Sequence, residues 1–549
     1  MEEKSTDRGN FIDENPLRII DLKRVRPRKF TLIACAWTFY DTVEFRSQQL
    51  GLGYVGAYAR QFGHELVGYI DPMINGGESV KAPLQTKYQL TNRYGHSDDW
   101  IISQIPGDTE VIGINAPFTD SRLVLYPMIK KIKASFPNIP IVVGGVLATT
   151  LPKQVIMESG ADAVVKGEGE IAFARILNGE PLESIPGLVF KKPNGDIFIS
   201  NFRSEQLKSI ADIPSPGYDF RPMEEYVRWS PRGNKADRTL SLISSRGCPF
   251  TCEFCSIPEK GQRWRPFEPE RVLEEIKMAV ERWGVNHIEF EDDNFTLQEP
   301  RALKVLQYIA DLRAKGYPMY CSFPNGIMID KMTQDLAVLM QKAGTDIAYL
   351  PVESGDTRVL VSMDKPNADG HLEKTLEVAR WCVDAGLRVS CFFIVAYPGG
   401  QISKKKYLRP EYEDYIVKDG EKWYMKGEDE KSFENTINFC KKLRDIGVQG
   451  ITPLIATPYP GTDLYEFCEK FGYLAFEDDK DILTTVSYAA VRADFVQIAT
   501  PWCSRIRAFE RWKTMYDMFP VYHNVRKEAG GEDLLSGQEI RKKYTDARE

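Results

Sequence analysis

Short apolar runs that alternate with amphipathic stretches restrict the fold of this chain more than any other feature. Between residues 30 and 190, apolar runs such as 110–118 and 139–146 are each followed by a helix-length stretch with mixed polarity. Continuously apolar strands that alternate with helices are typical of a parallel sheet covered on both faces. We therefore expect a doubly wound, Rossmann-like α/β domain that binds ligands beyond the carboxyl ends of its strands.

The alternation resumes after residue 238 with a longer period. The expected strands are 239–245, 287–292, 319–325, 346–354, 388–398 and 450–457. Six βα repeats predict a closed or partly closed parallel (β/α)6 barrel, in which function collects at the carboxyl ends of the strands. Polar residues cluster where almost every expected strand ends, which favours one shared site: Asp292, Asp293, Asn294, Asn325, Glu353, Ser354, Tyr397 and Thr457.

Four other segments complete the predicted organisation. Residues 1–29 are a lead-in, 191–238 a Pro-rich linker with a short hairpin, and 470–549 a mostly helical region after the barrel domain of 239–469. The charged insertion 401–432 is long for a βα connection, so we expect either surface decoration or a lid over the barrel mouth. The C-terminal region carries aromatic residues on a possible packing face: Trp502, Trp512, Tyr516 and Phe519.

Three of the ten cysteines crowd into the stretch SLISSRGCPFTCEFCSIP as Cys248, Cys252 and Cys255. Structural zinc sites usually need four ligands, and no fourth cysteine or histidine lies near this triple. A 4Fe–4S cluster is normally held by four thiolates, so three would leave one iron open to a substrate or cofactor. The spacing indicates a catalytic cluster. The other cysteines are scattered singly through apolar segments, which is typical of buried, reduced thiols in a cytosolic protein.

Composition excludes several classes of partner. The net charge of −7 and the pI near 5.6 lack the basic signature of nucleic-acid binding. The N-terminal stretch MEEKSTDRGNFIDENPLRII has no apolar core of a secretory signal, and no run of apolar residues is long enough for a transmembrane helix. We therefore expect a cytoplasmic protein without nucleic-acid partners or an integral membrane segment.

The cysteine motif, with Phe254 directly before its last cysteine and a six-repeat barrel behind it, resembles the radical S-adenosylmethionine (SAM) superfamily. The resemblance implies that Cys248, Cys252 and Cys255 ligate one 4Fe–4S cluster and that Phe254 borders the cofactors. In that family the open iron binds the amino and carboxylate groups of SAM. One electron from the cluster then generates a 5′-deoxyadenosyl radical, which implies a reducing partner such as flavodoxin or ferredoxin.

The resemblance also assigns roles to residues in other motifs of the barrel. In FEDDNFT, the resemblance assigns Asp292 and Asp293 to the SAM amino group, and in VESG it assigns Glu353 and Ser354 to the SAM ribose. FIVAYPGG, which contains Tyr397, resembles the turn after the fifth strand that lies along the adenine. It departs from the commoner ending, in which an acidic residue and a threonine follow the glycine, because the insertion starts there. ATPYPGT matches the ending of the sixth strand.

The N-terminal stretches GLGYVGAYARQFGHELVGYID and IVVGGVLATTLPKQVIMESGADAVVKGEGE resemble the cobalamin-binding subgroup of radical SAM enzymes, and the resemblance covers roughly residues 30–470. Bare backbone at two glycines that end a buried strand would let a large flat ligand approach, although an ordinary tight turn also explains them. The cobalamin contacts that the resemblance implies are Asn115, Gly144, Gly145, Gly167 and Glu168.

The first βα loop departs from the mutase type of cobalamin domain. That type carries Asp-x-His-x-x-Gly, with the histidine on cobalt, whereas WTFYDTVEFRSQQLG contains no histidine. We therefore expect cobalamin to bind without a histidine ligand. The alternative is a domain that kept the fold and lost the cofactor.

The resemblance implies a class B radical SAM methyltransferase that moves a methyl group from SAM, through methylcobalamin, to an unactivated carbon or, less often, phosphorus of a small molecule or peptide. The alternative is an oxidative cyclase or ring-forming enzyme without methyl transfer. Sulfur insertion is disfavoured, because it needs a second cluster from N-terminal cysteines and only Cys35 precedes the motif. An iron–sulfur redox sensor would explain the cluster but not the polar barrel rim.

Overall fold

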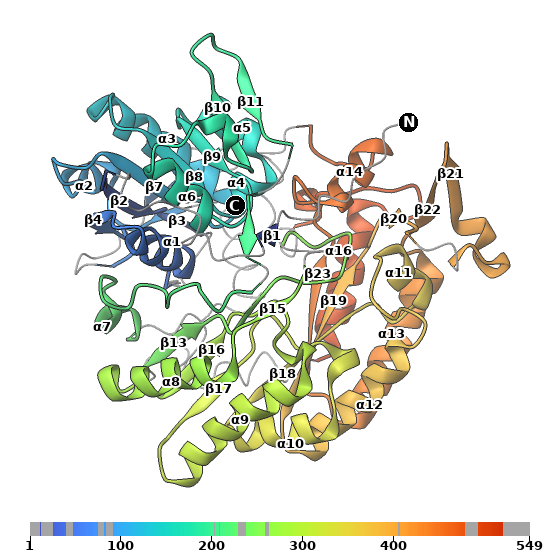
Figure 1. The fold of residues 1–549 in the computed structure, drawn as a ribbon. Helices are drawn as coiled ribbons and strands as arrows, with labels where there is room; N and C mark the ends of the chain where they lie inside the picture. The colour runs from blue at the N-terminus through green and yellow to red at the C-terminus, as the bar shows by residue number, and fades with distance from the viewer. Residues whose placement is uncertain are drawn as a thin grey trace, which may run out of the picture. The chain divides into compact units, whose positions relative to one another are not determined.

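The computed structural model of the protein describes residues 11–12, 26–39, 48–74, 82–83, 92–201, 204–207, 209–228, 238–257, 263–403, 407–477 and 492–519. The chain forms two compact units, whose elements are labelled in Figure 1. Unit 1 comprises Met1–Pro231 and Ile257–Phe267, and unit 2 comprises Arg232–Ser256 and Glu268–Glu549. Unit 1 therefore takes in most of the predicted linker, together with a short segment that follows the cysteine motif.

A seven-stranded sheet with the order β11-β10-β9-β8-β7-β2-β4 forms the centre of unit 1. Neighbours from β4 to β9 pair in parallel, whereas β10 pairs antiparallel with both β9 and β11. Its strands are β2 (Lys29–Ala34), β4 (Glu65–Ile70), β7 (Val111–Asn115), β8 (Ile141–Gly144), β9 (Ala163–Val165), β10 (Leu188–Lys191) and β11 (Ile197–Ile199). The predicted doubly wound domain is confirmed, and β11 extends its sheet into the residues that we expected to be linker.

Helices cover both faces of this sheet, because successive strand residues point to opposite sides. In β2, Phe30 and Leu32 join the core cluster that contains Leu52 of α1, whereas Ile33 joins the cluster that contains Ile129 of α3. The first cluster also includes α6, and the second includes α2, α4 and α5. These helices are α1 (Leu50–Gln61), α2 (Asp98–Ser103), α3 (Arg122–Ser135), α4 (Val146–Thr150), α5 (Pro152–Glu158) and α6 (Glu170–Leu177).

Smaller elements complete unit 1. A three-stranded sheet has the order β3-β6-β5, and β1 pairs in parallel with β12. Their bounds, with those of the remaining elements, are β1 (Phe11–Ile12), β3 (Trp37–Phe39), β5 (Ala82–Pro83), β6 (Asn92–Tyr94), β12 (Gln206–Leu207), β15 (Arg265–Pro266) and α7 (Met223–Tyr226), with 3-10 helices at Thr119–Ser121 and Leu182–Ser184.

Unit 2 contains six parallel strands in chain order, arranged as the sheets β13-β16-β17 and β18-β19-β23. They are β13 (Thr239–Leu242), β16 (His287–Phe290), β17 (Tyr320–Ser322), β18 (Ile347–Glu353), β19 (Arg388–Val395) and β23 (Gly450–Ile455). A short strand, β14 (Ser245–Arg246), follows β13. These six strands form the open, partial barrel that the sequence predicts.

The helices between these strands lie in an arc on the outer side of the barrel (Figure 1). They are α8 (Pro269–Trp283), α9 (Glu299–Ala314), α10 (Gln334–Lys342), α11 (Thr357–Ser362), α12 (His371–Asp384) and α13 (Glu430–Ile446), and α14 (Asp463–Lys470) follows β23. 3-10 helices occur at Phe295–Leu297, Ile329–Lys331, Pro410–Tyr415 and Ala493–Phe495. None of the described helices is both long enough and apolar enough to span a membrane.

The insertion after β19 forms its own antiparallel sheet, with the order β20-β22-β21. These strands are β20 (Gly399–Gln401), β21 (Ile416–Asp419) and β22 (Lys422–Lys426), and the last described helix of the chain is α16 (Arg505–Asp517). Trp512 of α16 is buried, stacks on Tyr516 and donates its indole N–H to the Pro453 carbonyl oxygen at 2.9 Å. Trp512 therefore packs as predicted, while much of 470–549 lies outside the described residues.

His287 ties the first sheet of unit 2 together. Its Nδ1 lies 3.0 Å from Oγ1 of Thr239 in β13, its Nε2 lies 2.8 Å from Oγ of Ser322 in β17, and its ring stacks on Tyr320. Burial lowers the pKa of His287 to about 4. The folded state therefore holds a neutral imidazole, whereas an unfolded histidine takes up a proton near pH 6.5.

We expect unit 2 to lose stability as the pH falls from 6.5 towards 4, because the unfolded state then binds a proton that the folded state excludes. At pH 5 this amounts to about 2 kcal/mol relative to pH 7. H287Q retains hydrogen-bonding groups but cannot titrate, so its melting temperature should fall less than that of the wild type between pH 7 and pH 5. An equal fall in the melting temperatures of H287Q and the wild type would contradict the assignment of this pH dependence to His287.

Candidate functional site

The loop that follows β14 carries Cys248, Cys252 and Cys255, and these are the cysteines that are partly exposed. The other seven cysteines are buried, as predicted. The loop begins at Gly247, whose φ of 90° favours glycine. Within the loop, the Cys255 N–H donates to the Cys252 carbonyl oxygen at 3.1 Å. The structure thus places three partly exposed thiols on one irregular loop, whereas the other seven thiols are buried.

Burial favours the neutral form of two of these thiols, Cys248 and Cys252. Burial raises the pKa of Cys252 to about 12, the nearby Cys255 and Cys248 act in the same direction, and Lys365 opposes them. Burial also raises the pKa of Cys248, against a hydrogen bond from the Phe250 backbone. Metal coordination deprotonates such thiols outright, so this chemistry suits a metal cofactor that brings its own positive charge.

The donor set fits an iron–sulfur cluster better than a single ion. Among the described residues, no three His, Cys, Asp or Glu side chains are close enough to hold one metal ion. A zinc ion needs its ligands at tetrahedral positions about 2.0–2.3 Å from one centre. A 4Fe–4S cluster instead takes each thiolate on a different iron, so it accepts thiols that are spread along a loop.

Glu253, which sequence reasoning did not single out, fixes this loop. It is buried, its N–H donates to the Met363 carbonyl oxygen at 3.0 Å, and its carbonyl oxygen accepts from the Leu464 N–H at 3.0 Å. Its carboxylate accepts from the Gln401 N–H at 3.1 Å. Next to it, the Thr251 hydroxyl donates to Asp364 at 2.5 Å. A charged residue between two cysteines of an otherwise apolar motif is the signal that could have revealed it.

Asp292 and Asp293 follow β16 and differ in their surroundings. The Asp292 carboxylate accepts from the N–H and the hydroxyl of Ser244, at 2.9 and 2.7 Å, and from the Ser245 hydroxyl. It therefore braces the end of β13, and its contact with the SAM amino group stays a prediction. Burial and the Asp292 charge raise the pKa of Asp293 to about 6, opposed by a hydrogen bond from the Gly247 backbone. Asp293 remains the candidate for a ligand contact.

Two further side chains near the loop complete this end of the barrel. Asn294 is buried and hydrogen-bonds the Cys248 thiol. Asn325 donates to the Glu291 carbonyl oxygen at 3.2 Å, which ties the end of β17 to the end of β16. Both residues lie on the polar rim that the sequence predicts.

Glu353 ends β18 with a φ of 66°, which an L-residue adopts at a cost. Its carboxylate pairs with the Lys365 ammonium at 2.9 Å, and the two side chains are only 9% and 11% exposed. Burial alone would lower the pKa of Lys365, but the charges of Glu353 and Cys252 raise it, so the lysine stays protonated beside the cysteine loop. Ser354 is fully buried, and its hydroxyl lies 3.4 Å from that of Thr436 in α13, within the core.

The end of β19 brings Tyr397 towards the cysteine motif. Tyr397 is fully buried, and its ring lies edge-on to that of Phe254 at 6.4 Å. Gly427 and Glu428, near the end of the insertion 401–432, return to this turn, since the Glu428 N–H donates to the Tyr397 carbonyl oxygen at 2.7 Å. The Glu428 carboxylate accepts from the Ala396 N–H at 2.8 Å. An acidic residue near the end of the insertion thus contacts the turn after β19, which lacks one in its own sequence.

In unit 1, Asn115, Gly144, Gly145 and Gly167 gather at the carboxyl edge of the sheet. Asn115 of β7 pairs with Gly144 of β8, and Gly145 has a φ of 101° that no side chain would accommodate beside the Asn115 amide. The Thr149 hydroxyl accepts from the Gly167 N–H at 3.0 Å and donates to the Gly145 carbonyl oxygen at 2.9 Å. In the part of the chain that the structure describes, no atom lies within 4 Å of the position of a Cβ on Gly144, so its backbone is open to a ligand.

Glu168 is engaged differently from these four residues. Its carboxylate forms a bidentate ion pair with Arg265, and both side chains are almost fully buried. The Ser204 hydroxyl donates to the Glu168 carbonyl oxygen at 2.5 Å. Arg265 belongs to the segment of unit 1 that follows the cysteine motif, and its neighbour Phe267 stacks on Tyr54. We infer that Glu168 anchors this segment within unit 1, since its carboxylate is committed to Arg265.

Comparisons with known proteins agree with both parts of this arrangement. Residues 242–405 match the Radical SAM superfamily, and residues 37–177 match the B12 binding domain. The chain is 31% identical over 372 residues to an uncharacterized methyltransferase, PH0819, of Pyrococcus horikoshii, covering 66% of this chain and 69% of that protein. It is 27% identical to the cytidylyl-2-hydroxyethylphosphonate methyltransferase of Streptomyces wedmorensis, covering 64% and 69% of the two chains.

The fold has a counterpart among solved structures. The cobalamin-dependent S-adenosylmethionine radical enzyme OxsB with aqua-cobalamin bound superposes with a TM-score of 0.60 at 16% identity, covering 95% of this chain and 71% of that one. At this identity the likeness concerns the fold alone.

The Glu353–Lys365 pair gives a direct test of the site's electrostatics. K365M leaves a buried carboxylate without its cation, so we expect it to lower the free energy of unfolding by about 3 kcal/mol. The double variant E353Q/K365M removes both charges and should recover much of that loss, as measured by anaerobic urea denaturation. The exposed pair Lys374–Glu377 is the control, since K374M should cost less than about 1 kcal/mol. A K365M protein as stable as the double variant would contradict the pairing.

Proposed function

The chain belongs to the cobalamin-dependent radical SAM methyltransferases, and we propose that it transfers a methyl group from SAM to an unactivated carbon or phosphorus centre of a small molecule or peptide. The observation that carries this proposal is the cysteine loop, which follows β14 and carries the three partly exposed thiols of the chain. The open glycine edge of unit 1 supports the cobalamin part. Bound together, the cluster, SAM and cobalamin supply the radical and methyl chemistry.

The residues of unit 2 hold and shield the reacting groups. We propose that Cys248, Cys252 and Cys255 ligate the cluster and that the aromatic rings of Phe254 and Tyr397 exclude water from it. Lys365 keeps a positive charge near Cys252 and so stabilises its thiolate form.

We propose two further SAM contacts from the resemblance. The Asp293 carboxylate accepts from the SAM amino group, a role that suits a side chain not committed to the β13 brace. The backbone of the turn 396–398 lies along the adenine, with its shape set by the left-handed Ala396.

The residues of the glycine edge suit a cobalamin without a histidine ligand. We propose that the backbone of Gly144, Gly145 and Gly167 approaches the ring and that Asn115 adds a polar contact. His64 directly precedes β4, so it belongs to the amino end of the sheet, opposite this edge. There its ring accepts from the Arg28 N–H at 3.2 Å and lies 3.0 Å from the Asn178 amide oxygen. His64 is thus committed to the fold.

The proposed reaction also implies an electron donor and a reducing environment. We propose a flavodoxin or ferredoxin as the donor and the cytoplasm as the compartment, because seven buried cysteines remain free thiols. The net charge of −7 supports the absence of a nucleic-acid partner.

The proposal is tested by anaerobic reconstitution with iron, sulfide and hydroxocobalamin, followed by desalting, reduction and addition of SAM with a labelled methyl group. We expect cluster and cobalamin absorption bands, formation of 5′-deoxyadenosine, and label in the cobalamin-containing fraction. The variant C252A should lose the cluster and the 5′-deoxyadenosine. Formation of 5′-deoxyadenosine without movement of the label would favour the ring-forming alternative, and loss of both activities would favour a redox protein.

Gly144 provides a separate test of the cobalamin edge. A Cβ at this position meets no atom of the described residues within 4 Å, so G144A should change the free energy of unfolding by less than about 0.5 kcal/mol. If cobalamin approaches this backbone, the added methyl group occupies its space and should weaken binding about tenfold or more (about 1.4 kcal/mol). G107A is the matched control, because Gly107 is equally open but precedes the amino end of β7. Equal cobalamin affinity of G144A and G107A would contradict the placement.

A further inference from the structure

The turn after β19 is held in a conformation that its own residues do not favour. Ala396 has a φ of 58°, and a left-handed residue with a Cβ costs about 1 kcal/mol or more. Such a conformation persists where the surroundings over-determine it. Two backbone hydrogen bonds help to fix this conformation. The N–H groups of Gly427 and Glu428 donate to the carbonyl oxygens of Pro398 and Tyr397, respectively.

The buried Glu428 carboxylate also holds this turn. It accepts from the Ala396 N–H at 2.8 Å, and the residue is 1% exposed. Burial raises the pKa of Glu428 to about 7, while the Arg511 charge acts in the opposite direction. A buried carboxylate is costly unless a cation and further hydrogen bonds satisfy it.

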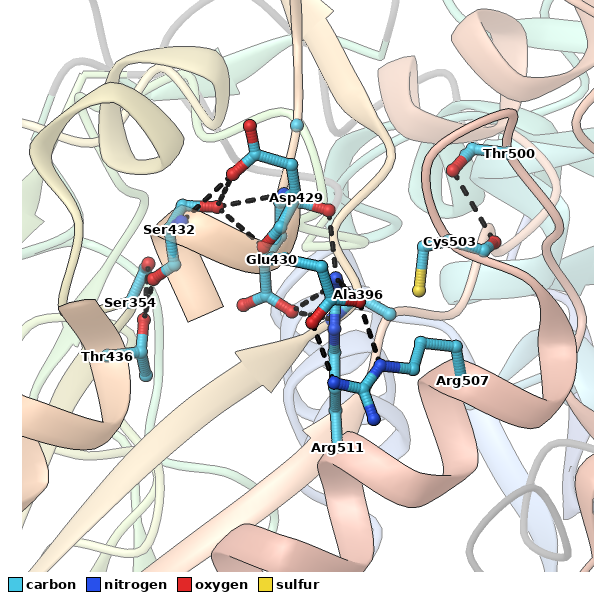
Figure 2. A network of polar contacts seen from close by, with 12 residues as sticks. Ser354, Ala396, Asp429, Glu430, Ser432, Thr436, Thr500, Cys503, Arg507 and Arg511 are labelled. Carbon is cyan, nitrogen blue, oxygen red and sulfur yellow. Dashed lines mark hydrogen bonds and ion pairs between the residues drawn. The ribbon is translucent and has the colours of Figure 1, made fainter. Parts of the chain in front are cut away.

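Arg511 of α16 supplies that cation. It is fully buried, and its Nη1 donates to the Glu428 carboxylate and to the Glu428 carbonyl oxygen, both at 3.1 Å. Its Nη2 donates to the Glu430 carboxylate at 3.0 Å. Figure 2 shows Arg511 reaching from its helix towards Ala396 and Glu430, with Arg507 beside it. The planar guanidinium thus binds three acceptors at once, a geometry that lysine cannot reproduce.

The helix that carries Arg511 is itself fixed on the barrel. Its neighbour Trp512 is buried and donates to the Pro453 carbonyl oxygen of β23. Arg507, one turn earlier on the helix, is 42% exposed, and its side chain pairs with Glu430 and Glu510. The described contacts therefore form one line from β23 through α16, Arg511 and Glu428 to Ala396.

We propose that Arg511 is a positioning residue for SAM. It orients the Glu428 carboxylate, which holds the Ala396 N–H and with it the shape of the turn 396–398. This inference rests on the proposed function, in which that turn lies along the adenine of SAM. It makes SAM affinity depend on a helix outside the six-strand barrel.

The test measures SAM affinity of the reconstituted, cluster-loaded full chain by equilibrium dialysis, at a temperature well below the melting point of each variant. We expect R511M to raise the Kd for SAM about tenfold or more (about 1.4 kcal/mol) with an unchanged iron content. R511K should recover part of the lost SAM affinity, because lysine restores the positive charge but not the planar guanidinium that binds three acceptors. R507M, the matched control on the same helix, should bind SAM within twofold of the wild type.

A second variant keeps the proposal testable if R511M does not fold. E428Q/R511M removes both buried charges and retains an acceptor for the Ala396 N–H, so it should fold. The double variant should still bind SAM more weakly than the wild type, because no arginine orients the amide side chain at position 428. The rate of 5′-deoxyadenosine formation at saturating SAM should stay within about threefold of the wild type, as expected when ground-state binding is lost.

Two outcomes separate this inference from the proposed function. A cluster-loaded wild type that does not bind SAM would overturn the proposed function. A wild type that binds SAM, with folded R511M or E428Q/R511M binding it equally tightly, would overturn only the positioning role of Arg511.

Discussion

The hydrogen bonds that Asp292 accepts from Ser244 and Ser245 are the constraint on which the rest of the site depends. They fix the point at which the chain leaves β13 and enters the cysteine loop. The carboxylate is buried, so it is stable only while its donors stay in place. We propose that the three thiols share one cofactor, and they then need such a fixed starting point, because an error in the first residues of the loop would displace all of them. Glu253 then ties the middle of the loop to the rest of unit 2.

The backbone at the ends of β18 and β19 is stabilised in the same way. Each ends in a non-glycine residue with a left-handed backbone, Glu353 or Ala396, and each is secured by a buried ion pair. At β18 the pair includes the left-handed residue itself and Lys365. At β19 the pair is Glu428 with Arg511, and it acts through the Ala396 N–H. Strained backbone of this kind clusters at functional sites, where the surrounding structure compensates its cost.

One edge of the sheet in unit 1 combines uncovered glycine backbone with a buried ion pair. The glycines of this edge leave backbone uncovered, which suits a broad ligand, and Gly145 also needs its glycine because of the Asn115 and Ala116 oxygens. Glu168 is only one residue beyond Gly167, yet its carboxylate is committed to Arg265. A substitution at Glu168 would therefore disturb its ion pair with Arg265, and its contact with cobalamin stays a prediction.

The sequence by itself determined the doubly wound sheet, the six-strand barrel, the cysteine loop and the burial of the other cysteines, because each depends on residue pattern or spacing over a short stretch. Only the tertiary structure decided which charged groups are available for a ligand. Asp292 and Glu168 are committed to partners 48 and 97 residues away, and the carboxylate of Glu428 reaches the β19 turn from across the insertion. Arg511 meets Glu428 across 83 residues. No local pattern encodes such pairings, since they exist only once separate elements have packed together.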